Sequence, residues 1–119
     1  MWDVETTDQF AAWYRGLEDN DEESVTVAVE QLQANGPALR RPLVDVIKQS
    51  ALKNMKELIP LGGRNIRILF AFDPRRTAIL LLGGDKSNDW DEWYDRNVPI
   101  AEQLYAEYLH ELRHEGLLS

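Results

Sequence analysis

Cationic side chains gather in one stretch of an otherwise acidic chain. Residues 37–82 carry nine basic and three acidic side chains, whereas residues 1–36 carry one basic and nine acidic, and residues 83–119 carry three basic and nine acidic. The cations of the segment 64–86 are Arg64, Arg67, Arg75, Arg76 and Lys86. Because the net charge is −8, cations concentrated in this way indicate a local anion site. The pI of about 4.7 argues against a protein that coats nucleic acid through bulk charge.

The segment 64–86 is predicted to fold as a tight β-hairpin. Alternate apolar side chains from Ile66 to Phe72 share one parity and therefore face one side of the first strand, while Arg67 faces the other side at the entrance of the strand. Residues 73–76, Asp-Pro-Arg-Arg, have the composition of a β-turn with proline at its favoured second position.

The second strand of the hairpin leads to the other cation. Residues 77–83 are apolar on both parities, which predicts a central strand that is covered on both faces. The chain is expected to turn after Gly83-Gly84, and Lys86 follows directly. Strand ends often carry functional groups, and backbone amides can face an anion there.

The remaining elements are expected to support this hairpin in an α+β fold. They are a strand over 2–5, a helix at about 8–19 capped by Thr6-Thr7, a helix from Asp21 to Gly36, a strand over 54–59, a short helical stretch with Trp90, Trp93 and Tyr94, and a final helix that Pro99 opens, with a stripe of Ile100, Leu104, Tyr108 and Leu112. Residues 37–50 give no clear element beyond a loop at Arg40-Arg41-Pro42. The predicted order is β-α-α-β-β-β-α, a mostly antiparallel sheet packed by an N-terminal helical hairpin and a C-terminal helix.

Composition limits the class of protein. At 119 residues the chain is expected to form one domain, residues 1–119, and its 44% hydrophobic and 29% charged residues are typical of a soluble globular protein. There is no cysteine, so disulfides and thiolate metal sites are excluded, which suits a cytoplasmic protein. No apolar run approaches the roughly 20 residues of a membrane helix, and the N-terminus does not resemble a signal peptide. We therefore expect no membrane partner.

One short motif suggests zinc. Residues 110–114, His-Glu-Leu-Arg-His, match the H-E-x-x-H pattern of zinc peptidases. Only five residues follow, which leaves no segment for a downstream third ligand. Two surface histidines near a helix C-terminus are the better interpretation, because the helix dipole favours cations there. We expect no metal site.

Four segments in a fixed order carry a resemblance to a known family. They are Lys56-Glu57-Leu58, the run from Ile66 to Arg75, Gly84-Asp85-Lys86-Ser87 and Trp93-Tyr94. In this order the chain resembles the HigB branch of the RelE/ParE toxin superfamily, closest to its phage-derived actinobacterial members, over nearly its whole length. The resemblance implies the RelE fold, cleavage of messenger RNA often on the ribosome, no metal or cofactor, and neutralisation by a helix-turn-helix (HigA-like) antitoxin.

Cleavage of RNA without a metal needs activation of the ribose 2′-OH, stabilisation of an anionic phosphorane and protonation of the leaving 5′-oxygen. With the resemblance, Arg67 is expected to bind the phosphate through its planar guanidinium. Lys86 would stabilise charge or assist the leaving group, Glu57 would accept a proton, and Tyr94 would donate a proton or stack on a base. The expected RNA-binding residues are Lys53, which would share the strand face of Glu57, and Arg64, Arg75 and Arg76.

Purely structural interpretations stay open for each of these residues. Glu57 and Arg67 can form a cross-strand ion pair, Tyr94 can pack beside the two tryptophans, and Lys86 can be an ordinary exposed lysine. Two other functions also stay open: a weak or inactive toxin that mainly binds its antitoxin, and a gyrase-directed toxin of the ParE type. The first is suggested by the acidic charge and by Ile59, which stands where the family usually has an arginine after Lys-Glu-Leu.

Overall fold

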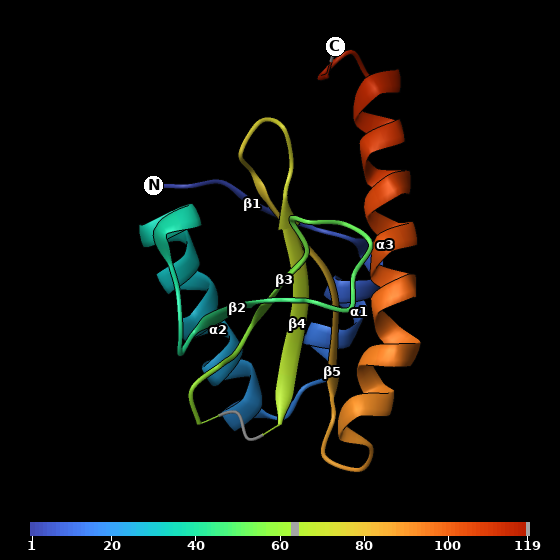
Figure 1. The fold of residues 1–119 in the computed structure, drawn as a ribbon. Helices are drawn as coiled ribbons and strands as arrows, with labels where there is room; N and C mark the ends of the chain where they lie inside the picture. The colour runs from blue at the N-terminus through green and yellow to red at the C-terminus, as the bar shows by residue number, and fades with distance from the viewer. Residues whose placement is uncertain (63–64, 119) are drawn as a thin grey trace.

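A five-stranded sheet lies between two layers of helix (Figure 1). The computed structural model describes residues 1–62 and 65–118. The elements are β1 (Val4–Thr6), α1 (Asp8–Arg15), α2 (Asp19–Asn35), the 3-10 helix η1 (Gly36–Ala38), β2 (Val44–Val46), β3 (Lys56–Leu58), β4 (Ile66–Phe72), β5 (Ala78–Asp85) and α3 (Trp90–His114). The strands lie side by side in the order β1-β5-β4-β3-β2, with β1 parallel to β5 and the other pairs antiparallel. This arrangement confirms the predicted α+β fold.

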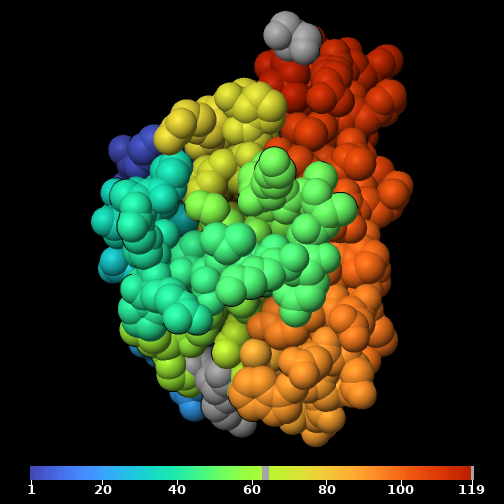
Figure 2. Space-filling model, viewed as in Figure 1, coloured from blue at the N-terminus to red at the C-terminus, as the bar shows by residue number. Residues whose placement is uncertain are grey.

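The two faces of the sheet bury two separate apolar clusters. Alternate side chains of β4 from Ile66 to Phe70 pack with Phe10 of α1 and with Val25 and Leu32 of α2. Leu69 and Ala71 point the other way and pack under α3. The parity predicted for β4 is therefore confirmed, and the face that carries Arg67 is covered by α3. In the space-filling view, α3 forms one whole flank of the molecule, in orange to red, and the segment around β2 lies across the front in green (Figure 2).

The end of β5 is shaped by a β-bulge and two glycines. Leu69 pairs with Leu82 and Phe70 with Leu80, so the ladder between β4 and β5 passes over Leu81. After this shift Gly83 lies against the ring of Trp13 and Gly84 against the ring of Trp93, on opposite faces of the strand. The expected turn after the glycine pair is wrong, because β5 continues to Asp85. The glycines are required by the two indoles, which leave no room for a Cβ.

Three other expectations need correction. Residues 44–46 form the edge strand β2, which is only three residues long and therefore shows no periodicity. The aromatic stretch and the C-terminal helix are one helix, α3, with Pro99 inside it. Because α3 begins at Trp90, its buried face runs through Trp93, Val98, Ala101 and Leu104, and the predicted core residue Ile100 is 48% exposed.

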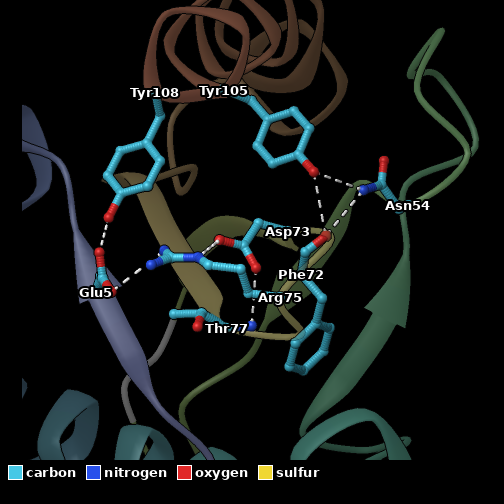
Figure 3. Close-up of polar contacts among 8 residues, drawn as sticks. All are labelled: Glu5, Asn54, Phe72, Asp73, Arg75, Thr77, Tyr105 and Tyr108. Atoms are coloured by element: carbon cyan, nitrogen blue, oxygen red, sulfur yellow. Dashed lines mark hydrogen bonds and ion pairs between the residues drawn. The ribbon is translucent and has the colours of Figure 1, made fainter. Parts of the chain in front are cut away.

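At the turn between β4 and β5, α3 is held to the sheet by polar contacts (Figure 3). Tyr108 donates a hydrogen bond to Glu5 of β1, and Glu5 also pairs with Arg75 at 3.3 Å. Arg75 pairs in turn with Asp73 at 2.8 Å. Tyr105 donates to the carbonyl of Phe72 at 3.2 Å. These contacts join α3 to β1 and to the hairpin turn. None of the described helices has the length and apolar character needed to cross a membrane.

We predict that Gly83→Ala and Gly84→Ala each lower the free energy of unfolding by about 1–3 kcal/mol, because an added methyl overpacks the site. A Cβ would lie 2.3 Å from the Trp13 ring at Gly83 and 2.7 Å from Trp93 Nε1 at Gly84. Urea denaturation measures the change. The matched control is Gly16→Ala, where the nearest atom is 3.6 Å away. If the Gly83 and Gly84 variants are as stable as the control, the packing argument is incorrect.

Candidate active site

Four side chains from four different elements meet at the end of the sheet where β4 begins and β5 ends. Glu57 comes from β3, Arg67 from β4, Tyr94 from the first turns of α3, and Lys86 directly follows β5. Glu57 pairs in register with Leu69, so Arg67 is its diagonal neighbour on the same face. All four candidates for catalysis named from the sequence are thus brought together.

Tyr94 lies between the carboxylate and the ammonium group. Its hydroxyl donates to Glu57 Oε1 at 2.6 Å and accepts from Lys86 Nζ at 3.0 Å. Glu57 is 9% exposed, and Tyr94 and Lys86 are each 7% exposed. Burial and the hydrogen bond to Glu57 raise the pKa of Tyr94 well above 10.0, so the hydroxyl keeps its proton at neutral pH.

Arg67 completes the cluster but is not fully satisfied within it. Its Nε lies 3.4 Å from Glu57 Oε1, and its NH1 donates to the carbonyl of Ile66 at 2.8 Å. The Nε atom is buried and makes no hydrogen bond to any described residue. The cross-strand ion pair that was open at the sequence level therefore exists. The pair holds the guanidinium beside the carboxylate without giving Nε a hydrogen bond.

Lys86 is enclosed by aromatic rings and by a like charge. Its Nζ lies 4.3 Å from the ring centroid of Trp90 and 4.9 Å from that of Tyr94. Burial lowers the pKa of Lys86 below its ordinary 10.5, and the positive charge of Arg67 lowers it further, while Glu57 and Asp91 act in the opposite direction. Lys86 is therefore not an ordinary exposed lysine. It is a buried ammonium group that donates a hydrogen bond to Tyr94 and lies near a second cation.

The local structure explains why these groups converge. Arg67 pairs in register with Gly84, whose missing side chain admits the Trp93 ring. This contact between the Trp93 ring and Gly84 places the first turns of α3 over the sheet, and Tyr94 packs edge to face with Trp93 at 5.2 Å. Tyr94 can therefore reach across to Glu57. The sequence shows this convergence only through the family resemblance, because no local pattern links Glu57 to Tyr94.

Of the expected RNA-binding residues, Arg75 and Arg76 do not join the cluster. Arg75 is held by Asp73 and Glu5, and Arg76 lies over the Trp2 ring at 5.4 Å, both in the turn at the far end of β4. Five residues of β4, 68–72, separate Arg67 from that turn, which places the two about 20 Å apart along the strand. Arg64 lies outside the described residues.

The expected strand position of Lys53 is wrong. It lies exposed in a turn before β3, because that strand begins only at Lys56. Its neighbour Asn54 donates to the carbonyl of Phe72, which places this turn toward the far end of β4 as well. The expected common face of Lys53, Glu57 and Arg67 does not form.

His110 and His114 lie exposed on the last turns of α3. Within residues 1–62 and 65–118, no three histidine or acidic side chains are placed so that they could hold a metal ion. The arrangement thus offers acid–base and electrostatic chemistry from Glu57, Arg67, Lys86 and Tyr94.

Comparisons with known proteins agree with the fold and with the resemblance. Residues 12–106 match the family described as phage-derived protein Gp49-like. The chain is 52% identical over 101 residues to "Putative toxin HigB3" of Mycobacterium tuberculosis, covering 85% of this chain and 88% of that protein. It is 46% identical over 104 residues to "Putative toxin HigB2" of the same organism, covering 86% of this chain but 52% of that protein. The resemblance to HigB-like proteins is thereby confirmed.

Solved structures show the same fold at low identity. The isolated Escherichia coli RelE toxin superposes with a TM-score of 0.59 at 11% identity, covering 81% of this chain and 98% of that chain. A chain of the archaeal RelE–RelB complex from Pyrococcus horikoshii superposes with a TM-score of 0.57 at 12% identity, covering 73% of this chain and 97% of that chain.

We predict that Tyr94→Phe lowers the free energy of unfolding by about 1–3 kcal/mol, because the buried Glu57 carboxylate loses a donor. Urea denaturation followed by tryptophan fluorescence measures the change. The control is Tyr14→Phe, whose hydroxyl bonds to Thr26 in a partly exposed position and is expected to contribute less. Equal effects of the two variants would show that the Tyr94 hydroxyl is not the link between Glu57 and Lys86.

Proposed function

The chain belongs to the Gp49-like family of phage-derived proteins, and from this premise we propose that it is the toxin of a type II toxin–antitoxin pair that inhibits translation by cleaving messenger RNA. The observation that carries the proposal is the buried cluster of Arg67, Lys86, Glu57 and Tyr94. In it, two cations share one carboxylate, and Arg67 Nε makes no hydrogen bond to a described residue. The cluster therefore has more positive than negative charge and a guanidinium whose hydrogen bonds are incomplete, which suits a phosphate.

The chemistry is transfer of the phosphodiester to the adjacent 2′-oxygen. Glu57 takes the proton of the 2′-OH, and the 2′-oxygen attacks phosphorus. The bond to the 5′-oxygen then breaks, and Lys86 supplies the proton that this oxygen needs. The products are a 2′,3′-cyclic phosphate and a 5′-hydroxyl end. No metal or other cofactor enters the reaction, so cleavage is expected to persist in EDTA.

Arg67 and Tyr94 support these proton transfers in different ways. Arg67 faces the same space as Glu57 and binds the non-bridging oxygens, where negative charge develops in the phosphorane. Tyr94 keeps its proton and holds the carboxylate of Glu57 and the ammonium of Lys86 at 2.6 and 3.0 Å from one oxygen. It is therefore proposed as the group that positions the acid and the base.

The charge of the whole protein bears on its substrate and its location. With a net charge of −8, the chain is repelled by free RNA, so binding to messenger RNA needs a second positive contribution. A ribosome that already holds the message supplies substrate positioning, and translation places the protein in the cytoplasm. The proposed protein partner is a helix-turn-helix antitoxin of the HigA type.

We predict that Arg67→Ala and Lys86→Ala each reduce the cleavage rate by at least about 100-fold, because each removes a charge at the phosphorane or leaving group. The measurement is cleavage of a translated message with purified ribosomes, with product ends analysed for 2′,3′-cyclic phosphate. Growth after induced expression is followed in parallel.

The controls are Arg15→Ala and Lys48→Ala, which remove exposed cations that are not members of the cluster. They are expected to cleave and to arrest growth like the wild type. If the Arg67 and Lys86 variants do so as well, the site assignment fails. A wild-type protein that neither cleaves message nor slows growth would instead favour an inactive antitoxin-binding protein, and DNA damage without message loss would favour a gyrase-directed toxin.

We also predict that the rate falls as pH rises through the pKa of Lys86, at a pH below 10.5, because only the protonated amine can serve the leaving group. Tyr94 does not cause this fall in rate, the alkaline limb of the pH–rate profile, since its pKa is raised above 10.0. In Lys86→Arg the guanidinium stays charged, so the alkaline limb disappears while the rate is lower at all pH values. A limb that is unchanged in Lys86→Arg would exclude Lys86 as the acid.

A further inference from the structure

Trp90 is an exposed aromatic side chain at the edge of the buried cluster. It is 54% exposed, whereas Trp93 is buried and Trp2 and Trp13 are half-buried. One face of its indole is covered by Lys86 Nζ at 4.3 Å from the ring centroid. A ring that is covered on one face and still more than half exposed presents its other face to solvent. Trp90 belongs to neither of the two apolar clusters that the described residues form.

Lys86 relates the exposed face of the Trp90 indole to the proposed site of cleavage. The ammonium group lies between Trp90 and Tyr94, at 4.3 and 4.9 Å from the two ring centroids. Trp90 is also one helical turn before Tyr94 on α3. The indole is therefore held beside the group that faces the leaving oxygen, and its outer face lies at the boundary between the cluster and solvent.

We propose that the exposed face of Trp90 is a nucleobase-binding subsite, on which a base next to the scissile phosphate stacks. The inference rests on the proposed RNA cleavage and adds to it the group that recognises the base. Stacking on an aromatic side chain contributes a factor of about 5 to 150 in affinity per base. The ammonium on the opposite face withdraws electron density from the indole, so an electron-rich purine stacks better than a pyrimidine.

The test is a double-mutant cycle between Trp90 and the base. A short message carries a single abasic site at successive positions around the cleavage point, and wild type, Trp90→Ala and Trp90→Phe are compared on ribosomes programmed with it. In the wild type, one abasic position is expected to raise KM about 5- to 150-fold with a smaller change in kcat. Trp90→Ala is expected to raise KM for the intact message by a similar factor. For this variant, the abasic site at that position causes no further rise in KM. In Trp90→Phe, the abasic site again raises KM by most of the wild-type factor.

If Trp90 only positions Lys86 and does not bind a base, the expected result is different. Trp90→Ala would then lower kcat equally for intact and abasic messages, so the two changes would be additive, and the subsite would be overturned. Ile100→Ala, which removes another exposed apolar side chain of α3, is the matched control and is expected to leave KM unchanged. If the wild type cleaves no message at all, the proposed function itself fails; additivity in an active wild type contradicts only the subsite.

Discussion

The packing of α3 across one face of the sheet is the constraint on which the rest of the structure depends. At the end where the helix begins, the buried hydroxyl of Tyr94 joins Glu57 of β3 to Lys86 after β5. At the far end, Tyr105 and Tyr108 bind the hairpin turn and β1. Between them, an apolar face from Val98 to Leu104 covers β4 and β5. The helix is thus anchored at both ends by tyrosine hydroxyls, and the long apolar contact fixes its direction.

This anchoring has an electrostatic consequence at the site. Burying the Glu57 carboxylate and two cations is unfavourable unless each group finds partners, and Tyr94 satisfies two of them with one oxygen. Arg67 is left with an unsatisfied Nε, and Lys86 has a lowered pKa. A cluster with these properties is less stable than an apolar one of equal volume, which is characteristic of functional sites. The same feature that weakens the core supports the proposed binding of a phosphate.

The register of β4 against β5 decides which groups the helix can gather. The bulge at Leu81 places Leu81 and Leu82 on the α3 side, and it brings Gly84 opposite Arg67. Two indoles then close on Gly83 and Gly84 from opposite faces. One consequence is that Lys86 leaves the strand beneath the first turn of α3, with Trp90 over its ammonium group. The glycines therefore act through packing, and not as a loop whose amides face an anion.

Much of the fold follows from local patterns in the sequence. The alternation from Ile66 to Phe72, the Asp-Pro-Arg-Arg turn and the doubly apolar strand after it each depend on near neighbours only, so they could be predicted. Strand β2 and the uninterrupted α3 could not. A three-residue edge strand has no period, and Pro99 is tolerated inside a helix that tertiary packing holds on both sides of it.

The candidate site likewise has features that the sequence indicates and features that depend on the tertiary structure. By itself the sequence determined that one segment is basic within an acidic chain, that Arg67 faces away from the Ile66 side of its strand, and which residues match the family. Only the tertiary structure decided which of those cations lie together. Arg75 and Arg76 are closer to Lys86 in sequence than Arg67 is, yet the length of the hairpin carries them to the opposite end. In contrast, α3 brings Tyr94 to Glu57 from 37 residues away. Charge is a property of the residue, but its partners are set by long-range packing.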